Sequence, residues 1–214
     1  MPSATPSRKR EGNLTIALID YGAGNLRSVH NALLAAGAQD VAVTADPDIV
    51  AKADRIVLPG VGAFAACMNG LSAISGLVEA MERRVRDEGA PFLGICVGMQ
   101  LLADAGEEHG RHAGLGWVGG TVRPFDPAPG LRIPHMGWND VLPACAHPVI
   151  VRGEAYYLHG YHVAGAAHVA ATSEHGGPFT AAVARDTIVG VQFHPEKSQA
   201  YGLATLERFL QWRP

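Results

Sequence analysis

Residues Phe92 to Leu102 read FLGICVGMQLL, and this stretch says more about the fold than any other part of the chain. An apolar run leads into GICVG at positions 94–98, and a helical pattern follows. The arrangement matches the GxSxG nucleophile elbow, with cysteine in place of serine. Glycines two positions before and after the central residue remove side chains that would collide in so tight a turn. The stretch therefore predicts Cys96 as a nucleophile at a helix N-terminus, where backbone N–H groups favour the thiolate.

A buried cysteine in an ordinary strand-to-helix turn is the alternative, because cysteine is among the residues most often buried. The paired glycines, the preceding strand and the following helix together favour the elbow over that alternative.

Strand and helix patterns alternate around the elbow in the first half of the chain. The expected strands are 14–19, 40–43, 55–58 and 91–95, and the third is expected to stop at Pro59-Gly60. Helices are expected from the turn at 21–25 to about 36, over 77–88, and over 99–103 and beyond. This alternation predicts an α/β fold with a mostly parallel sheet and helices on both faces.

The second half of the chain has a different pattern, in which short strands are separated by Gly, Pro, Asn and Asp. The expected strands are 118–122, 149–151, 155–158, 161–164, 169–172, 179–184 and 188–193, followed by a closing helix over 204–212. Short spacings of this kind predict antiparallel pairing.

Length and composition favour one domain that buries a sizeable core. The chain has 214 residues, of which 48% are hydrophobic. We expect residues 14–214 to form this domain and residues 1–13, which are polar and lack the apolar stretch of a secretory signal, to form a disordered tail.

Charge and cysteine content narrow the function classes. A formal charge of −3 does not favour a nucleic-acid or membrane surface as partner. No apolar run reaches the roughly 18 residues that a membrane helix needs, so a cytoplasmic protein is the default expectation. The three cysteines do not suggest a disulfide framework, and no Cys/His spacing indicates a metal site.

A candidate base for the cysteine lies in the sequence GVQFHPEKS at positions 190–198. His194 ends an apolar strand, and Pro195 biases it toward an extended backbone. Glu196 lies two residues further on, so both side chains project to the same side if the backbone stays extended. We expect Glu196 to accept a hydrogen bond from one imidazole nitrogen while the other faces Cys96. An ordinary loop after a strand is the alternative, and the presence of the elbow makes it the weaker one.

Taken together, GICVGMQ and HPE resemble the class I, triad-type glutamine amidotransferases. The resemblance runs from about Thr15 to Trp212. It implies a flavodoxin-like sheet with an added antiparallel strand region, and catalytic residues Cys96, His194 and Glu196. Further motifs are similar to the glutaminase subunits of imidazole glycerol phosphate synthases of histidine biosynthesis: YGAGN at 21–25, PGVG at 59–62, PHMGWN at 134–139 and YYLHGY at 156–161.

That resemblance implies a glutaminase that hydrolyses glutamine to glutamate and ammonia through a cysteine thioester, without a cofactor or metal. It also implies a heterodimer with a (β/α)8 cyclase subunit, which uses the ammonia to make imidazole glycerol phosphate and AICAR.

Backbone donors for the oxyanion of the reaction are expected from two places. The elbow supplies the N–H of Val97, and the PGVG turn is expected to supply a second donor at Gly60 or Val61. Glycines on both sides of Val61 allow a peptide plane to flip. We therefore hypothesise that the oxyanion hole is incomplete until the partner is loaded.

The resemblance also assigns residues to substrate and partner. Glutamine is expected to contact Gly62, Gln100, Glu108, His159, Gly160 and Tyr161. Gly160 stands where the family usually has a hydroxyl residue, so only backbone contacts are expected from it. The partner interface is expected at Asn25, Trp138, Tyr156 and Lys197, since Trp and Tyr are frequent interface anchors. A core position is the alternative for Trp138.

Three other functions fit parts of the sequence. The glutaminase component of anthranilate or pyridoxal phosphate synthesis differs in its partner, and PHMGWN disfavours it. A stand-alone cysteine hydrolase would be expected to carry its histidine next to the nucleophile, where this chain has Val97. A nucleotide-binding module is disfavoured because Arg27 stands at the third glycine of GxGxxG.

Overall fold

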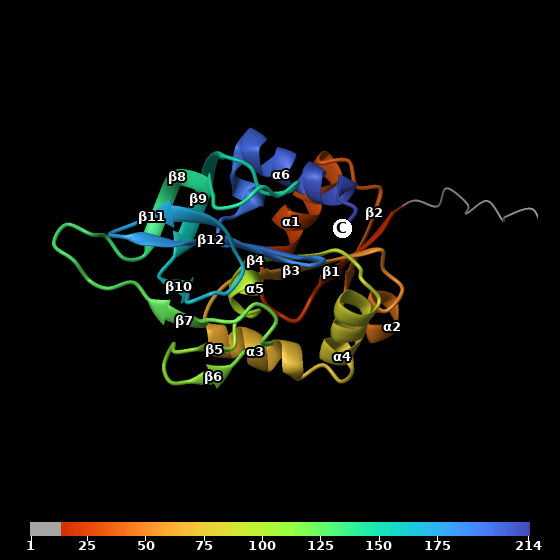
Figure 1. The fold of residues 1–214 in the computed structure, drawn as a ribbon. Helices are drawn as coiled ribbons and strands as arrows, with labels where there is room; N and C mark the ends of the chain where they lie inside the picture. Colours follow the sequence, from red (N-terminus) through yellow and green to blue (C-terminus); the bar gives the residue numbers. More distant parts are fainter. Residues whose placement is uncertain (1–13) are drawn as a thin grey trace, which may run out of the picture.

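A nine-stranded sheet runs through the centre of the molecule (Figure 1), in the order β2-β1-β3-β4-β13-β12-β11-β8-β9. The computed structural model describes residues 14–214, and the expected tail at 1–13 lies outside the described residues. Five neighbouring strands are parallel: β1 (Thr15–Ile19), β2 (Asp40–Thr44), β3 (Arg55–Gly60), β4 (Phe92–Cys96) and β13 (Ile188–Val191). β3, β4 and β13 are buried along their whole length, as expected for strands covered on both faces.

Antiparallel strands continue the same sheet beyond β13. They are β12 (Pro178–Arg185), β11 (Val169–Glu174), β8 (His135–Pro143) and β9 (Gly153–His159). A separate four-stranded sheet has the order β10-β7-β5-β6, with β5 (Ala105–Gly106), β6 (His112–Ala113), β7 (Thr121–Pro124) and β10 (Tyr161–Ala164). The predicted α/β fold, mostly parallel with an added antiparallel region, is confirmed.

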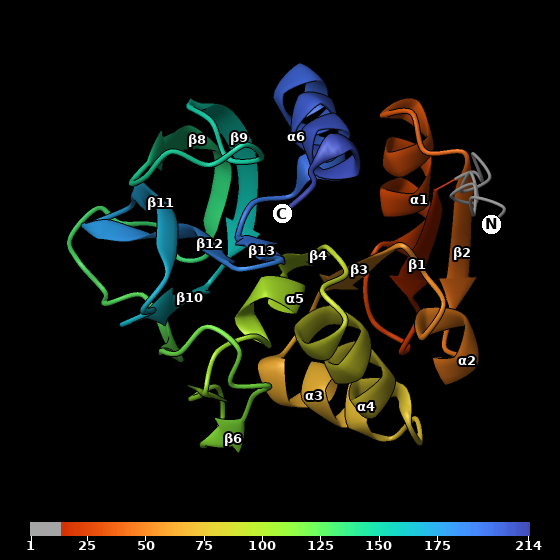
Figure 2. The ribbon, with the colours of Figure 1, turned by 45° about the vertical axis from the view of Figure 1, so that its right-hand side comes forward.

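Helices cover both faces of the parallel strands (Figures 1 and 2). On one face lie α1 (Leu26–Ala35) and α6 (Gln199–Gln211). On the other lie α2 (Pro47–Val50), α3 (Phe64–Ser72), α4 (Leu77–Glu82) with its π-helical continuation Arg83–Asp87, and α5 (Val97–Gln100). The expected helix over 77–88 is therefore present, with a wider last turn.

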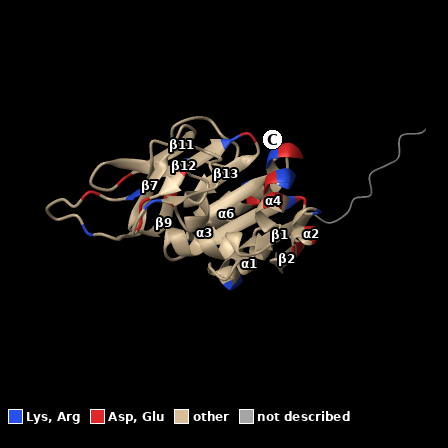
Figure 3. Cartoon of the chain, turned by 90° about the horizontal axis from the view of Figure 1, so that it is seen from below, with Lys and Arg blue, Asp and Glu red and all other residues tan. Residues whose placement is uncertain are grey.

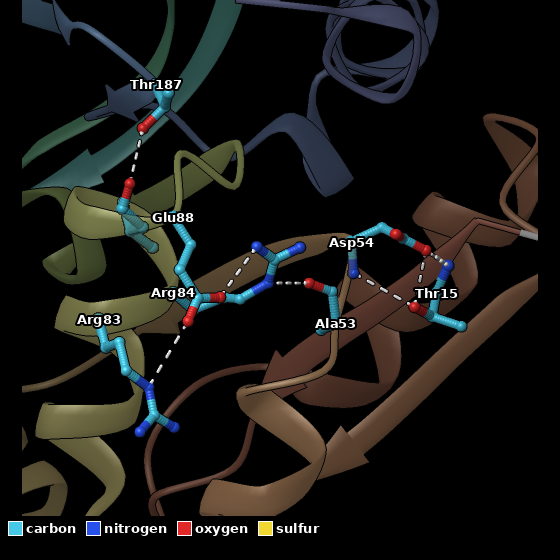
Figure 4. Close-up of polar contacts among 8 residues, drawn as sticks. Thr15, Ala53, Asp54, Arg83, Arg84, Glu88 and Thr187 are labelled. Carbon is cyan, nitrogen blue, oxygen red and sulfur yellow. Dashed lines mark hydrogen bonds and ion pairs between the residues drawn. The ribbon is translucent and has the colours of Figure 1, made fainter.

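Polar contacts anchor α4 and its continuation to the sheet at the end opposite the elbow (Figure 4). Arg84 Nε donates to the Ala53 carbonyl at 2.7 Å, just before β3. Thr15, at the start of β1, donates through both its backbone N and its Oγ1 to Asp54 Oδ2 at 2.9 Å. Thr187 Oγ1 donates to the Val85 carbonyl at 3.2 Å just before β13. These bonds lie where three of the parallel strands, β1, β3 and β13, begin.

β3 extends two residues further than the sequence predicts, through Pro59 and Gly60. β1 pairs with β3 only as far as Val57, so the β1 side of the strand is unpaired at Pro59. A proline, which has no N–H to donate, is tolerated where a ladder bond is not required. Pairing with β4 continues to Gly60, which lies opposite Cys96.

Two other expected strands are wrong in position or absent. Instead of 118–122, the strand is β7 at Thr121–Pro124, because Gly119 and Gly120 have φ of 74° and 86° and break the extended backbone. Residues 149–151 form no strand. Their carbonyls are satisfied by side chains of α6 instead: the Val149 carbonyl accepts from Arg208 and the Val151 carbonyl from Tyr201.

Charged residues are interspersed by sign along the described chain (Figure 3). Within residues 14–214, no single helix is long and apolar enough to cross a membrane. One pair bent by 93°, 64–72 with 77–87, passes the same length and composition test jointly.

Candidate active site

The elbow predicted around Cys96 is present. β4 ends at Cys96 and α5 begins at Val97, with Cys96 at φ 55° and ψ −112°. A non-glycine residue with positive φ is uncommon, and such strain is held only where the surroundings fix it. A Cβ added at Gly94 would lie 2.7 Å from the Gly98 carbonyl oxygen, and one added at Gly98 would collide with the Leu58 carbonyl. The steric role predicted for both glycines is therefore confirmed.

The sheet order brings the other two expected site segments to either side of the elbow. β4 lies between β3 and β13, with Gly60 opposite Cys96 and Val191 opposite Ile95. The carboxyl ends of parallel strands meet at one edge of the sheet. The PGVG turn after β3 and the HPE segment after β13 are therefore neighbours of Cys96.

His194 and Glu196 make the expected contact, with His194 Nδ1 2.8 Å from Glu196 Oε1. Their side chains are 3% and 1% exposed. The backbone does not stay extended as the sequence suggested, because Pro195–Lys197 form a 3-10 turn. Ser198 stabilises this turn by donating to the His194 carbonyl at 2.6 Å, and His194 N donates to the Tyr156 carbonyl at 2.9 Å. The imidazole is thus held from its backbone and from one ring nitrogen.

The protonation of His194 follows from these neighbours. Burial disfavours the charged imidazole, but hydrogen bonding to Cys96 and to Glu196, with the negative charge of both, raises the pKa of His194 to about 10. The proton therefore rests on the imidazole at neutral pH.

A cavity of about 310 Å³ opens at this edge of the sheet and contains most of the expected site residues. Its lining includes Val61, Gly62, Cys96, Val97, Gln100, Glu108, His159, Gly160, Tyr161 and His194, together with Lys197 from the expected interface set. Pro134 and Leu158 also line it and were not expected. Glu196 lies behind His194, and Gly60 is buried beneath the turn.

Gln100 and Glu108 are fixed at the cavity wall by hydrogen bonds of known direction. Gln100 Nε2 donates to the Tyr161 carbonyl at 2.9 Å and to Gln192 Oε1 at 3.1 Å, which leaves its Oε1 as an acceptor. Glu108 Oε2 accepts from the backbone N of Phe64 at 2.7 Å, at the start of α3. A carboxylate and an amide oxygen at one wall suit an ammonium group.

The ring of His159 is engaged away from the cavity. Its Nδ1 donates to the Tyr161 carbonyl at 2.9 Å, and its Nε2 lies 3.2 Å from His135 Nδ1. Any contact that His159 makes with a substrate is therefore through its backbone. Gly160 has room for a side chain, since an added Cβ would come no closer than 3.8 Å to Ile133.

Tyr21, from the YGAGN motif, and Cys67, which the sequence did not single out, hold the PGVG turn. Tyr21 Oη donates to the Pro59 carbonyl at 2.8 Å, and Cys67 Sγ donates to the Val61 carbonyl at 3.4 Å. Burial raises the pKa of the Cys67 thiol, so it remains a donor. Gly62 has φ 97°, a conformation that glycine adopts without strain.

An exposed aromatic group borders the cavity. Trp138 on β8 is 48% exposed, which rules out the core alternative, and it pairs across the strands with Tyr156 at 6.1 Å between ring centroids. Lys197 Nζ lies 6.0 Å from the centroid of the Tyr156 ring. Met136 on the same strand is 63% exposed. Asn25 is exposed at the start of α1 and makes no capping bond through its side chain.

Metal chemistry has no candidate ligand set in the part of the chain that the structure describes, since no group of three His, Cys, Asp or Glu there could hold an ion.

Comparison with known proteins gives one consistent family. Residues 17–211 match the family described as glutamine amidotransferase class-I. The chain is 59% identical to imidazole glycerol phosphate synthase subunit HisH of Zymomonas mobilis, with 96% of this chain and 100% of that protein covered. It is 54% identical to the subunit of the same name from Caulobacter vibrioides, covering 94% and 99%.

Solved structures share the fold at low sequence identity. One described as a glutamine amidotransferase has a TM-score of 0.70 at 18% identity, covering 91% of this chain and 97% of that one. A putative GMP synthase component from Thermoplasma acidophilum has a TM-score of 0.67 at 19% identity, covering 94% of both proteins.

Proposed function

Because the chain belongs to the class I glutamine amidotransferase family, we propose that it is the glutaminase subunit of an imidazole glycerol phosphate synthase. The observation that carries the proposal is the meeting of Cys96 and His194 in one cavity, with Glu196 hydrogen-bonded to His194 behind it. The relatives at 59% and 54% identity support the pathway, since each is named as a subunit of that synthase.

The reaction begins with a thiolate–imidazolium pair. His194 keeps its proton at neutral pH, and the sulfur of Cys96 beside it attacks, as the thiolate, the side-chain amide carbon of glutamine. The tetrahedral oxyanion is stabilised by the N–H of Val97 and by a second N–H from Gly60 or Val61. His194 gives its proton to the departing ammonia, and the glutamyl group remains on sulfur as a thioester.

Water then completes the hydrolysis. His194, now neutral, removes a proton from water as it attacks the thioester carbonyl. The intermediate collapses to glutamate and the Cys96 thiolate, and His194 again carries the proton. Glu196 holds Nδ1–H throughout, so Nε2 faces the reacting atoms.

Substrate orientation follows from the polar side chains that line the cavity. The Glu108 carboxylate and Gln100 Oε1 suit the α-ammonium of glutamine. Gly62 and the backbone of residues 159–161 complete the binding site. Glu108 accepts a hydrogen bond from the backbone N–H of Phe64, which comes two residues after the PGVG turn. The carboxylate that would recognise the substrate is therefore held close to that turn.

A partner is required by the fate of ammonia, which would be lost to water from an open site. We propose that a (β/α)8 cyclase subunit docks over the cavity, in contact with Asn25, Trp138, Tyr156 and Lys197. The oxyanion hole is completed when that partner is loaded. All three cysteines are free, which suits a reducing compartment such as the cytoplasm.

Glutaminase activity of the purified chain, alone and with a histidine-pathway cyclase and its substrate, tests this function. We expect strong stimulation by the loaded cyclase and its loss in Cys96→Ala. Cys145→Ala is the matched control, because Cys145 is exposed and does not line the cavity. Cys96-dependent activity that ignores the cyclase would move the protein to another pathway or to a stand-alone hydrolase. Full activity of the free subunit would contradict the incomplete oxyanion hole, and no Cys96-dependent activity under any condition would overturn the glutaminase assignment.

A further inference from the structure

We propose that Gln192 is a positioning residue for the nucleophile: it transmits the fixed orientation of the Gln100 amide to Cys96 and holds an N–H donor against the sulfur. The proposal rests on Cys96 being the nucleophile of the function proposed above. Gln192 follows β13 by one residue and comes two residues before His194, and its side-chain amide lies beside Cys96.

Gln192 is fully buried, with 0% of its surface exposed. Its backbone N donates to the Ala181 carbonyl at 2.9 Å, which fixes its position beside β12. Its side-chain Nε2 lies 3.8 Å from Cys96 Sγ, and its Oε1 accepts from Gln100 Nε2 at 3.1 Å. A buried amide of this kind is retained only if its polar atoms are satisfied, and both of these partners belong to the active site.

The direction of the amide chain is set by one backbone carbonyl. The Tyr161 carbonyl can only accept, so the nitrogen of the Gln100 amide must face it. The same nitrogen lies against the Gln192 amide, which must therefore present its oxygen there. This leaves the Gln192 nitrogen facing Cys96. Reversing the Gln192 amide would set two NH2 groups against each other and an oxygen lone pair against the sulfur.

An N–H donor suits the sulfur through the whole reaction. It stabilises the attacking thiolate, and it stabilises the thiolate again when the thioester collapses. An amide keeps its protons at every working pH, so it does not compete with His194 for the role of base. Since the group is buried, the interaction is stronger than the same contact in water.

The chain of amides also links substrate recognition to the nucleophile. Gln100 uses its nitrogen for Tyr161 and Gln192, and it offers its oxygen to the cavity. A ligand that binds this oxygen holds the Gln100 amide in place, and the Gln192 N–H is held against sulfur as a consequence.

Alkylation of Cys96 by iodoacetamide, followed by mass spectrometry of its peptide between pH 5 and 10, tests the role without glutamine or cyclase. Gln192→Met removes donor and acceptor at similar length. We expect the pH of half-maximal alkylation rate to rise by about one unit, a roughly tenfold loss of thiolate at a pH below the transition. Gln211→Met, on the exposed face of α6, is the matched control and is expected to follow the wild type.

A role in packing alone would lower thermal stability and leave the pH profile unchanged, and that result would overturn the proposal. Gln192→Glu keeps the shape of the side chain if Gln192→Met fails to fold, and it puts a carboxylate beside the sulfur. The same upward shift is expected from it, and an unchanged profile would contradict the proposal equally. Because Cys96 reactivity is read directly, failure here is distinct from failure of the glutaminase assay.

Discussion

Gly98 of the elbow packs against the backbone of Leu58 on β3, with no room between them for a Cβ. Gly98→Ala is therefore expected to force apart the two strands that form the site, and to lower the free energy of unfolding by about 3 kcal/mol or more. Gly160→Ala is the matched control, because its added Cβ meets nothing closer than 3.8 Å. Urea unfolding compares the two, and equal stability of both variants would contradict the steric account.

The elbow and the parallel strands could be predicted because their signals are local. An apolar run before Cys96 and glycines at fixed offsets describe the turn completely, and they place the sulfur without reference to the rest of the chain. The contact between His194 and Glu196 was predicted from their spacing, but the reason was wrong. The 3-10 turn depends on Ser198, whose hydroxyl bonds back to His194.

Other elements depend on contacts that a sequence does not display. The sequence did not predict α3, because Gly70 within it disfavours a helix. The structure shows why a glycine stands there: a Cβ at this position would lie 2.8 Å from the Tyr21 carbonyl oxygen. β8 contains Gly137 and Asn139, which are poor strand formers, and forms because it pairs along its length with β9. The contact between Gln192 and Cys96 could not be predicted from the sequence. The only signal was that Gln192 lies just before the HPE segment, and a residue at the end of an apolar strand is expected simply to be part of the core.

The pair of His194 and Glu196 predicts a loss of stability at alkaline pH. The pKa of His194 is raised from 6.5 to about 10. Its contribution to stability is therefore complete below pH 6.5 and is lost as the pH rises toward 10. Cys96 contributes to this raised pKa as well, so Cys96→Ala leaves the contribution of Glu196 alone; in that background we still expect the free energy of unfolding to fall as the pH rises above 7. Adding Glu196→Gln is expected to flatten this dependence. Parallel pH curves for the two proteins would show that the carboxylate does not hold the proton.

Acid lability is expected from the chain of hydrogen bonds behind the cavity. The Tyr161 carbonyl fixes the proton on His159 Nδ1, so His159 Nε2 must accept from His135 Nδ1. Both rings are therefore neutral. Burial lowers the pKa of His135 to about 4, helped by His175, and lowers that of His159 to about 3. Since both folded values lie below the unfolded one, stability is complete above pH 6.5. As the pH falls from 6.5 toward the folded pKa, each ring lowers the free energy of unfolding by about 1.4 kcal/mol per pH unit.

Urea unfolding at pH 7 and pH 5 measures that loss. His135→Gln is expected to be less stable than the wild type at pH 7 but to lose about 1–2 kcal/mol less on acidification, because one titrating ring is gone. His30→Gln on α1, outside the cluster, is the control and should retain the wild-type loss. An unchanged loss in His135→Gln would place the acid sensitivity elsewhere.

The aromatic group beside the cavity predicts a binding phenotype without a folding phenotype. Trp138→Ala removes a half-exposed ring, so we expect the affinity for the cyclase subunit to fall by about tenfold to a hundredfold with little change in thermal stability. Leu34→Ala on α1 is the control, since Leu34 is 43% exposed but lies away from the cavity. Isothermal calorimetry with the cyclase distinguishes them. Equal affinity of the two variants would remove Trp138 from the interface.

Cys67 predicts how firmly the PGVG turn is held in the free subunit. Its thiol donates to the Val61 carbonyl, while Tyr21 holds the Pro59 carbonyl, so the peptide between Gly60 and Val61 lies between two fixed neighbours. If the hole is incomplete in this conformation, Cys67→Ala removes a bond that favours the incomplete state. We expect partner-free glutaminase activity to rise by about threefold to tenfold, which is the effect of about 1 kcal/mol from one lost hydrogen bond. The stimulation by the cyclase should fall correspondingly.

Cys67→Ser keeps a donor and should resemble the wild type. A rise in Cys67→Ser as large as in Cys67→Ala would assign the effect to packing around α3 and not to the hydrogen bond.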